Sequence, residues 1–535
     1  MRKYIPSVVF ALLSCAPLAA AENALPERWV YVATNLQVDK VTDKLLELMG
    51  RAAQAGYTGI QLNDSKFAKL DDLGGMETYY FKNVERVKSR ASELKLELIP
   101  GLFSIGYSND ILWHDPNLAE ALPVVDAPFV VQGGVARLVP DAREFKKISF
   151  KDDNVSVENG VWKVVDPNGK NCRIVFKFPV QPHREYHISA LLKTENFQGA
   201  PEIKILGGPI QLAWSYLGAK ATQDWTEVHQ VFNSQECTEV NIYFGCWDAK
   251  HGTLQWKDAK FEQVGLMNAV RRDGAPLKIT NEKGEALTEG KDFEKFADPL
   301  MGSKPYKGTF DVYHQPPVLK TSLPDGTKLK VSYYHTMTVY DGQVMICPSE
   351  PKTWALFKHQ AELVHKAFGA KKYFMHFDEI RVLNHCAACS KRNLQPGQIL
   401  ADAARQATGL LHDTAPGAAI YTWNDMFDPF HNAVEKNYYL VKGDLRGSWE
   451  GLDKAVTIVE WNYGKRDESM DFFAKRGHKI IAAGYYDGSM DTAKWIESLK
   501  QSPASSGIMY TTWQQKYGEL ENFLKQVNAA FPTVK

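Results

Sequence analysis

Carboxylates and tryptophans follow the predicted strands in the second half of this 535-residue chain. The acidic and aromatic residues at these strand ends are Asp378, Glu379, Trp423, Asp425, Glu460, Trp461, Tyr485, Asp487 and Trp513, and Asp64 follows an earlier strand. Converging carboxylates suit acid–base chemistry on an acetal, which needs a proton donor and a group that stabilises an oxocarbenium-like transition state. Tryptophans exclude water and thereby raise the pKa of a proton donor.

Strands that alternate with helices position these residues. Three predicted strands (28–34, 59–62 and 96–102) alternate with helices at 39–54, where Asp39 is the expected cap, and at 78–94. After a helix at 351–368, five more strands follow, at 373–377, 419–423, 456–459, 479–484 and 507–511. Eight βα units predict an α/β fold, a closed (β/α)8 TIM barrel whose active site lies at the carboxyl ends of the strands.

The middle of the chain has a different pattern, with short alternating runs and turns that are typical of an antiparallel sandwich. We therefore expect the first part of the barrel at 22–125, an all-β jelly-roll-like sandwich at 126–265 that interrupts the barrel after its third strand, a β-rich return segment at 266–345, and the remaining barrel at 346–535. The stretches 186–190, 225–228 and 254–258 resemble carbohydrate-binding modules. A sandwich that binds no sugar stays an open alternative.

The first residues predict export. A basic start, an apolar stretch and Ala19-Ala20-Ala21 are typical of a signal peptide, here 1–21, which would place the protein in the periplasm or outside the cell. Leu12-Leu13-Ser14-Cys15 resembles a lipobox, so a lipid anchor at Cys15 is the alternative. No later segment has 18 consecutive apolar residues, so we expect no transmembrane segment.

Charge and cysteine content restrict the binding partners and metal sites that we expect. Lys and Arg together number 63, as do Asp and Glu, so no strong field attracts nucleic acid, and the expected partner is a glycan. Cys237 and Cys246 are candidates for a disulfide bridge. Cys386-Ala-Ala-Cys389, preceded by His385, could form a local bridge or bind metal, but no second cysteine pair follows at zinc-site spacing. We therefore expect no metal and no cofactor.

One stretch carries a family resemblance. Residues 348–354 and 373–379 resemble the family 20 glycoside hydrolases, the β-N-acetylhexosaminidases, in which a helix leads to a strand that ends in His-x-Gly-Gly-Asp-Glu. The later ends resemble that family in order and type: Glu460-Trp461-Asn462 its pocket-tryptophan strand, Tyr485-Tyr486-Asp487 its Tyr-x-Asp, and Trp513-Gln514-Gln515 its Trp-x-Glu.

The resemblance implies roles for these residues. Glu379 would be the general acid, and Asp378 would orient the 2-acetamido group of a β-linked N-acetylhexosamine, whose carbonyl attacks the anomeric carbon, so that no enzyme nucleophile is needed. Tyr485 would bind the acetamido oxygen and Asp487 a sugar hydroxyl. The other expected substrate contacts are Asp64, Trp423, Asp425, Glu460, Trp461, Trp513 and Gln515.

The sequence also departs from that family. Both glycines before the acidic pair are replaced, giving His376-Phe377-Asp378. No arginine follows the first strand at Asn35, Leu102 replaces a histidine after Pro100-Gly101, and Gln515 replaces a glutamate. These departures favour a different substrate or an endo-acting cleft over an ordinary exo-hexosaminidase.

Two further hypotheses stay open. In one, Glu379 is the acid/base and Glu460 the nucleophile of a retaining glycosidase on a sugar without an acetamido group. In the other, the protein binds glycans without cleaving them, on a degenerate barrel. Metal catalysis is disfavoured, since His376 is expected to be buried in a strand, and His385 and His431 lack the spacing of paired ligands on a helix.

Overall fold

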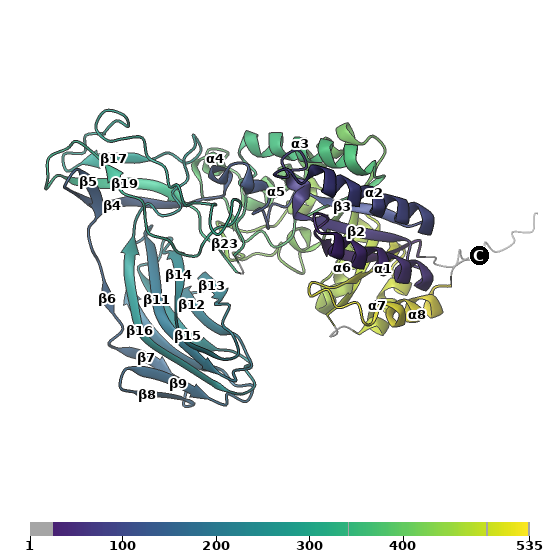
Figure 1. Cartoon of the computed structure of the whole chain (residues 1–535), viewed down its shortest axis with the longest axis horizontal. Coiled ribbons are helices and arrows are strands. Elements are labelled where there is room, and N and C mark those ends of the chain that lie inside the picture. Colours follow the sequence, from purple (N-terminus) through teal and green to yellow (C-terminus); the bar gives the residue numbers. More distant parts are fainter. Residues whose placement is uncertain (1–24, 341, 488–490, 533–535) are drawn as a thin grey trace, which may run out of the picture.

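The computed structural model describes residues 25–340, 342–487 and 491–532. The predicted signal peptide and Cys15 lie outside these residues. A barrel occupies one side of the molecule and the residues inserted into it occupy the other (Figure 1). Among the helices described, none combines the length and the apolar character that a membrane span requires.

Eight parallel strands close the barrel, three before the insert and five after it, as predicted. In order around the barrel they are β1 (Glu27–Thr34), β2 (Gly59–Asp64), β3 (Glu97–Leu102), β20 (Lys372–Met375), β22 (Ala419–Trp423), β24 (Thr457–Glu460), β25 (Ile480–Tyr486) and β26 (Ser505–Thr511), and β26 pairs with β1. This order brings the first and last strands together, so all eight carboxyl ends meet at one rim.

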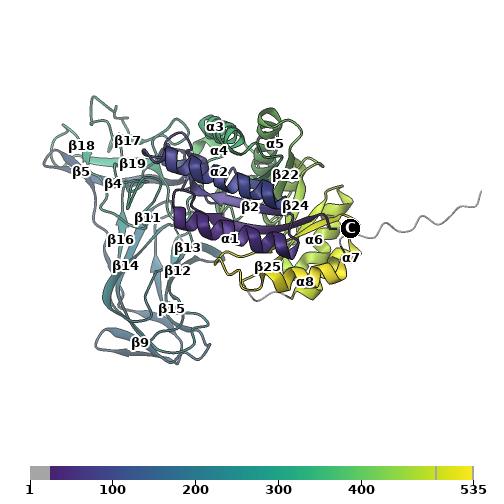
Figure 2. The ribbon, with the colours of Figure 1, turned by 45° about the vertical axis from the view of Figure 1, so that its right-hand side comes forward.

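Helices cover the outside of the barrel (Figure 2). They are α1 (Asp39–Ala55), α2 (Glu77–Leu94), α3 (Pro351–Phe368), α5 (Pro396–Thr414), α6 (Arg466–Lys475), α7 (Thr492–Gln501) and α8 (Leu520–Ala530). Asp39 is the first residue of α1 and the cap is Val38, so the predicted cap is wrong by one position. Between β22 and β24 the described chain has the turns η4 (Asp425–Phe427) and η5 (Ser448–Gly451) and the short strand β23 (Leu440–Val441), where a regular barrel has a helix.

Aromatic side chains fill the barrel interior. Trp29, near the amino end of β1, meets the ring of Tyr421 edge-on, with ring centroids 4.6 Å apart. Higher up, Trp423 is 1% exposed and packs against Phe374 at 4.9 Å and Trp513 at 5.7 Å. Trp423 is therefore part of the core directly below the rim.

The insert consists of a sandwich and a smaller sheet. One sandwich sheet has the order β13-β12-β15-β10-β7 and the other β14-β11-β16-β9-β8, with β6 (Arg143–Glu144) beside β16. The strands are β7 (Ile148–Lys151), β8 (Val155–Glu158), β9 (Val161–Val165), β10 (Cys172–Pro179), β11 (Glu185–Glu195), β12 (Pro201–Gly207), β13 (Ile210–Tyr216), β14 (Gln223–Asn233), β15 (Glu239–Cys246) and β16 (Thr253–Val264). The expected antiparallel sheets thus interrupt the barrel after β3.

The smaller sheet joins the two ends of the insert. Its order is β17 (Lys278–Asn281), β19 (Lys328–His335), β4 (Leu122–Gln132), β5 (Val135–Leu138) and β18 (Leu319–Lys320). The expected sandwich boundary at residue 126 falls inside β4, because β4 pairs along its length with β19 of the return segment. The outgoing and returning chains therefore form one sheet, which lies above the sandwich in Figure 1.

The predicted bridge between Cys237 and Cys246 is wrong, since all six described cysteines are free. Strand register explains the difference. Cys246 lies opposite Cys172 in the β10–β15 pairing. The Cys237 sulfur lies instead beside Gly207, where a Cβ would come within 2.3 Å of it.

Candidate active site

The acidic pair Asp378-Glu379 follows β20 at the rim. Burial, and next the charge of Glu379, raise the pKa of Asp378 to about 7. Gly106 leaves room for this turn, because a Cβ there would meet the Asp378 carbonyl oxygen at 2.0 Å. A loop of the insert's outgoing chain thus packs directly against the pair.

His376 lies close to Asp378, with its Nδ1 3.9 Å from Asp378 Oδ1. Its Nε2 lies 2.6 Å from Asn63 Oδ1, and burial lowers its pKa to about 4. Gly101 makes this contact possible, since a Cβ there would overlap both Asn63 and His376. His376 is hydrogen-bonded, as expected, but it lies one position after β20 and is only partly buried, not a buried strand residue.

Glu379 forms contacts through both its backbone and its side chain. Its φ of +48° is left-handed, its N–H donates to Asp425 Oδ2 at 2.9 Å, and its carbonyl accepts from Gln343 Nε2 at 2.9 Å. Its side chain forms an ion pair with Arg381 at 2.7 Å and accepts a hydrogen bond from the Tyr107 hydroxyl. These contacts fix the position of Glu379 at the rim.

Asp425 and Glu460 form a buried second row behind the pair, each 0% exposed. The Asn424 amide donates to Glu460 Oε1 at 2.9 Å and to Asp428 Oδ2 at 2.7 Å. Burial raises the pKa of both Asp425 and Glu460 well above the usual range, and the charges of Asp378 and Asp428 add to the effect. Asp425 Oδ1 and Glu460 Oε2 have no hydrogen-bond partner among the described residues. Asp425 and Glu460 are therefore buried behind the acidic pair, and burial favours their protonated forms.

Two tryptophans stand at the mouth of the barrel. Trp513 is 41% exposed, and its ring lies 4.7 Å from that of Tyr31. Trp461 is half-buried and meets the His431 ring edge-on at 4.5 Å. These rings offer the exposed apolar walls that the sequence predicts, whereas Trp423 lies beneath them.

Asp64 serves local structure. Its Oδ2 accepts from the Leu36 N–H at 2.8 Å and from the Tyr80 hydroxyl at 3.1 Å, and its Oδ1 accepts from the Lys66 N–H at 3.0 Å. It caps the turn η1 (Ser65–Ala68). With both oxygens engaged, Asp64 does not match the predicted substrate contact.

Three residues near the end of the barrel also differ from the roles that the resemblance implies. Tyr485 stacks on Tyr510 at 4.2 Å and packs toward Phe523 of α8, outside the barrel. Asp487 binds the turn after β26, with Oδ1 2.5 Å from Thr512 Oγ1. Gln515 is exposed in that turn with a φ of +55°. Tyr485 is thus directed away from the rim, and Asp487 is occupied as a turn cap.

The residues that sequence reasoning missed come mainly from the insert and its neighbouring loops. Arg381 lies two positions beyond the acidic pair, so its proximity was readable from the sequence. Tyr107 and Gln343 belong to the outgoing and returning ends of the insert, and nothing in their sequence context indicates that they meet Glu379.

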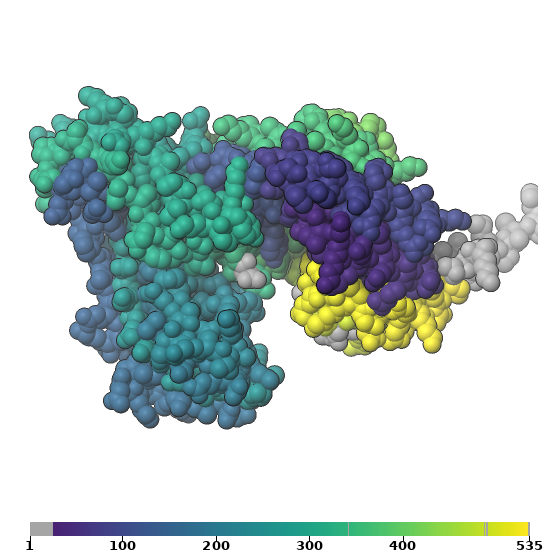
Figure 3. Space-filling model, in the orientation of Figure 1, coloured from purple at the N-terminus to yellow at the C-terminus, as the bar shows by residue number. Residues whose placement is uncertain are grey.

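The sandwich contributes aromatic side chains close to the rim. Trp214 and Tyr216 of β13 lie 5.0 and 5.9 Å from the Tyr340 ring. Tyr340 in turn lies 4.4 Å from the guanidinium of Arg381. In the space-filling view the surface is hollowed between the sandwich and the barrel (Figure 3). An aromatic path therefore leads from the sandwich to the acidic pair.

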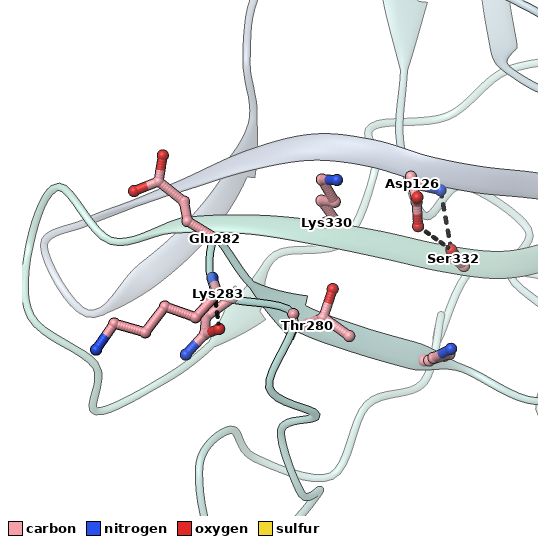
Figure 4. A pocket seen from close by; sticks show the side chains of 9 residues that line it. Asp126, Thr280, Glu282, Lys283, Lys330 and Ser332 are labelled. Carbon is pink, nitrogen blue, oxygen red and sulfur yellow. Dashed lines mark hydrogen bonds between the residues drawn. The ribbon is translucent and has the colours of Figure 1, made fainter.

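A separate hollow of about 340 Å³ lies on the smaller sheet (Figure 4). Its lining is polar and charged, with Lys278, Lys283 and Lys330 beside Glu282 and Asp126. Asp126 and Ser332 bond to each other across one end of the hollow (Figure 4). Because no aromatic ring and no cluster of carboxylates lines it, this hollow does not match the chemistry of the barrel rim.

No protein-family model matches the chain, and no curated protein matches it in sequence. Among solved structures, it is similar to a pneumococcal exo-β-D-N-acetylglucosaminidase with tandem GH20 catalytic modules (9% identity, 95% of this chain and 86% of that chain, TM-score 0.37). It is also similar to a β-N-acetylhexosaminidase from Bacteroides fragilis (8% identity, 94% and 66%, TM-score 0.38) and, over 22% of this chain and 77% of that chain, to a CBM4 module (18% identity, TM-score 0.17).

Proposed function

We propose that the protein is a glycoside hydrolase that acts on a glycan at the barrel rim, with Asp378 and Glu379 as the reacting carboxylates. One observation carries this proposal. Of the rim cluster formed by Asp378, Glu379, Asp425 and Glu460, only the first two reach the surface, with side chains 14% and 26% exposed. A carboxyl in a partly dry pocket whose pKa is raised to about 7, as that of Asp378 is, suits protonation of a glycosidic oxygen.

The finer proposal is substrate-assisted cleavage at a β-linked N-acetylhexosamine. A conventional retaining enzyme needs a second accessible carboxylate about 5 Å from the acid. Glu460 is 0% exposed and bonded to Asn424, which argues against the hypothesis that it is the nucleophile. The substrate's acetamido oxygen would then attack the anomeric carbon, Asp378 would orient that group, and Glu379 would protonate the leaving oxygen once the substrate loosens its ion pair with Arg381.

A second assignment exchanges the roles of the pair. The pKa of Asp378 near 7 suits a proton donor at neutral pH, whereas Glu379 forms an ion pair with Arg381 at 2.7 Å. In this version Asp378 protonates the leaving group, and Glu379 stabilises the developing positive charge. Both versions use the same two residues.

We further propose that the substrate is longer than one sugar and that the protein acts after export. The first point is supported by the aromatic path from Trp214 through Tyr340 to the rim, because aromatic rings stack on the apolar faces of pyranoses. The second is supported by the basic and apolar pattern of residues 1–21.

The test is release of p-nitrophenol from β-GlcNAc and β-GalNAc glycosides, run beside the matching glucoside and galactoside. Turnover of N-acetyl sugars alone would support substrate assistance, and turnover of the plain sugars would contradict it. If all four are inert, chitooligosaccharides and other long N-acetylated glycans are assayed next. Binding of these glycans without cleavage, unchanged in Glu379→Gln, would replace the hydrolase with the glycan-binding protein.

A further inference from the structure

Three cysteines and a glutamate from distant parts of the sequence meet in one buried place. They are Cys347, Cys386, Cys389 and Glu120, and their candidate ligand atoms all lie within 4.8 Å of one another. The cysteines are 0% exposed and Glu120 is 2% exposed. No other described group of three or more His, Cys, Asp or Glu residues converges in this way.

Four of the six distances between these atoms are close to those of a tetrahedral metal site, and the other two are below 4.8 Å. Cys347 Sγ lies 3.4 Å from Cys386 Sγ and 3.6 Å from Cys389 Sγ, and Glu120 Oε2 lies 3.7 and 3.5 Å from the sulfurs of Cys386 and Cys389. With Zn–S near 2.3 Å and Zn–O near 2.0–2.2 Å, a tetrahedral site needs about 3.8 Å between sulfurs and about 3.6 Å from sulfur to oxygen. A disulfide needs about 2.05 Å between sulfurs.

Surrounding groups orient the ligands. Glu120 Oε1 accepts from the N–H groups of His385 and Cys386 at 2.9 and 3.1 Å, which directs Oε2 to the sulfurs. The Cys389 sulfur lies 3.2 Å from Ser349 Oγ. Such outer contacts, which fix a ligand's direction, are characteristic of metal sites.

The charges of these four groups also favour a bound cation. Three thiolates and a carboxylate carry four negative charges, and a divalent ion leaves two. Arg272 is buried beside the cluster, where its charge acts on Cys347, Cys386 and Glu120 and also pairs with Glu350 at 3.2 Å, and carbonyl oxygens of Asn117 and Ala119 hold its guanidinium in place. Without an ion, four acidic groups would lie together away from water.

We propose that Cys347, Cys386, Cys389 and Glu120 bind one structural Zn²⁺ ion. Three sulfurs favour zinc over magnesium or calcium, and four buried protein ligands leave no open position for a substrate, as in structural sites. Sequence reasoning disfavoured zinc because Cys386 and Cys389 lack a second cysteine pair, and the fold supplies Cys347 and Glu120 instead.

The ion would join three segments next to the acidic pair. Glu120 lies where the chain leaves the barrel and Cys347 where it returns, and the two segments are already bonded, with the Cys347 N–H donating to Leu118 O at 2.8 Å. Cys386 is the N-cap of α4 (Ala387–Ser390) and Cys389 lies within it, in the segment that begins with Asp378-Glu379. The zinc would thereby fix the insert to the loop that carries the pair.

The experiment is metal analysis of the purified full chain by plasma mass spectrometry, as isolated and after incubation with ZnCl₂ and gel filtration. We expect about one zinc per chain, retained through filtration. Cys389→Ser should retain at least about tenfold less zinc. Cys237→Ser is the matched control and should keep full stoichiometry, because Cys237 lies in the sandwich beside Gly207.

A second measurement covers the case in which Cys389→Ser fails to fold. Cobalt replaces zinc in the wild-type chain, and thiolate ligation gives an intense sulfur-to-cobalt charge-transfer band in the near ultraviolet. Its appearance at one equivalent supports the site. The proposal is overturned if the wild-type chain takes up no zinc, if it holds another metal there instead, or if peptide mapping finds a disulfide among the three cysteines.

Discussion

Asp64 at the end of β2 and Asp378 after β20 are aspartates at the same rim of one barrel, and burial raises the pKa of both. They differ in what surrounds their oxygens. Asp64 has two backbone N–H groups and the Tyr80 hydroxyl as donors, all from nearby βα units. Asp378 has Glu379 beside it and Asp425 within electrostatic reach, and burial and the charge of Glu379 raise its pKa more than Arg381 lowers it. A carboxylate saturated by local donors caps a turn, whereas one set against other carboxylates is poised to exchange a proton.

The largest effect should come from Glu379→Gln. The amide keeps the shape but can neither donate a proton nor neutralise Arg381, so kcat should fall about 10²- to 10⁴-fold. Steady-state kinetics on the best substrate found measures this effect. The contrast variant is Asp64→Asn, whose kcat should stay within about twofold of the wild-type value. Equal losses in the two variants would remove the distinction between Asp64 and the acidic pair at this rim.

The pH profile of kcat/KM should identify the role of Asp378. Its pKa near 7 means that it is protonated below pH 7 and ionised above. If Asp378 orients the acetamido group as a carboxylate, activity falls about tenfold per pH unit below 7; if it donates the proton, activity falls by that amount above 7. A flat profile through pH 7 would show that Asp378 does not titrate in the reaction.

Sequence periodicity was sufficient for the barrel, because each strand is an apolar run of its own and its carboxyl end is visible in the chain. Asp378 and Glu379 were found for the same reason. Tyr485 was misplaced by a local irregularity: the register of β25 shifts between Ala483 and Tyr485, and such a shift changes the face on which a side chain emerges.

Contacts between distant segments could not be predicted. Arg381 is close in sequence to Glu379. Only the fold shows that the insert's Tyr107 hydrogen-bonds to Glu379 and its Gln343 to Arg381. Likewise Cys347 and Glu120 approach Cys386 only because the insert leaves and returns at the same place. The chemistry of single strand ends was readable, and the chemistry that depends on the insert was not.

Asp64→Asn should instead lower stability. The amide can accept at one atom, so the N–H of Leu36 or Lys66 loses its partner, at a cost of about 1–3 kcal/mol in the free energy of unfolding. Urea denaturation followed by tryptophan fluorescence measures this cost. Asp71→Asn is the control: Asp71 pairs with His359 at the surface, and its loss should cost less than about 1 kcal/mol. A stable Asp64→Asn chain with impaired kinetics would return Asp64 to the substrate site.

The smallest effects should separate the barrel mouth from the sandwich. Trp513→Ala removes an exposed ring next to Tyr31 and should raise KM up to about tenfold for short and long substrates alike, which corresponds to about 1.4 kcal/mol. Trp214→Ala acts farther from the acidic pair, through Tyr340, so it should raise KM only for long glycans. Kinetics on an aryl glycoside and on a long oligosaccharide test the pair of variants. If Trp214→Ala impairs both substrates equally, the sandwich positions the rim loops and does not extend the glycan site.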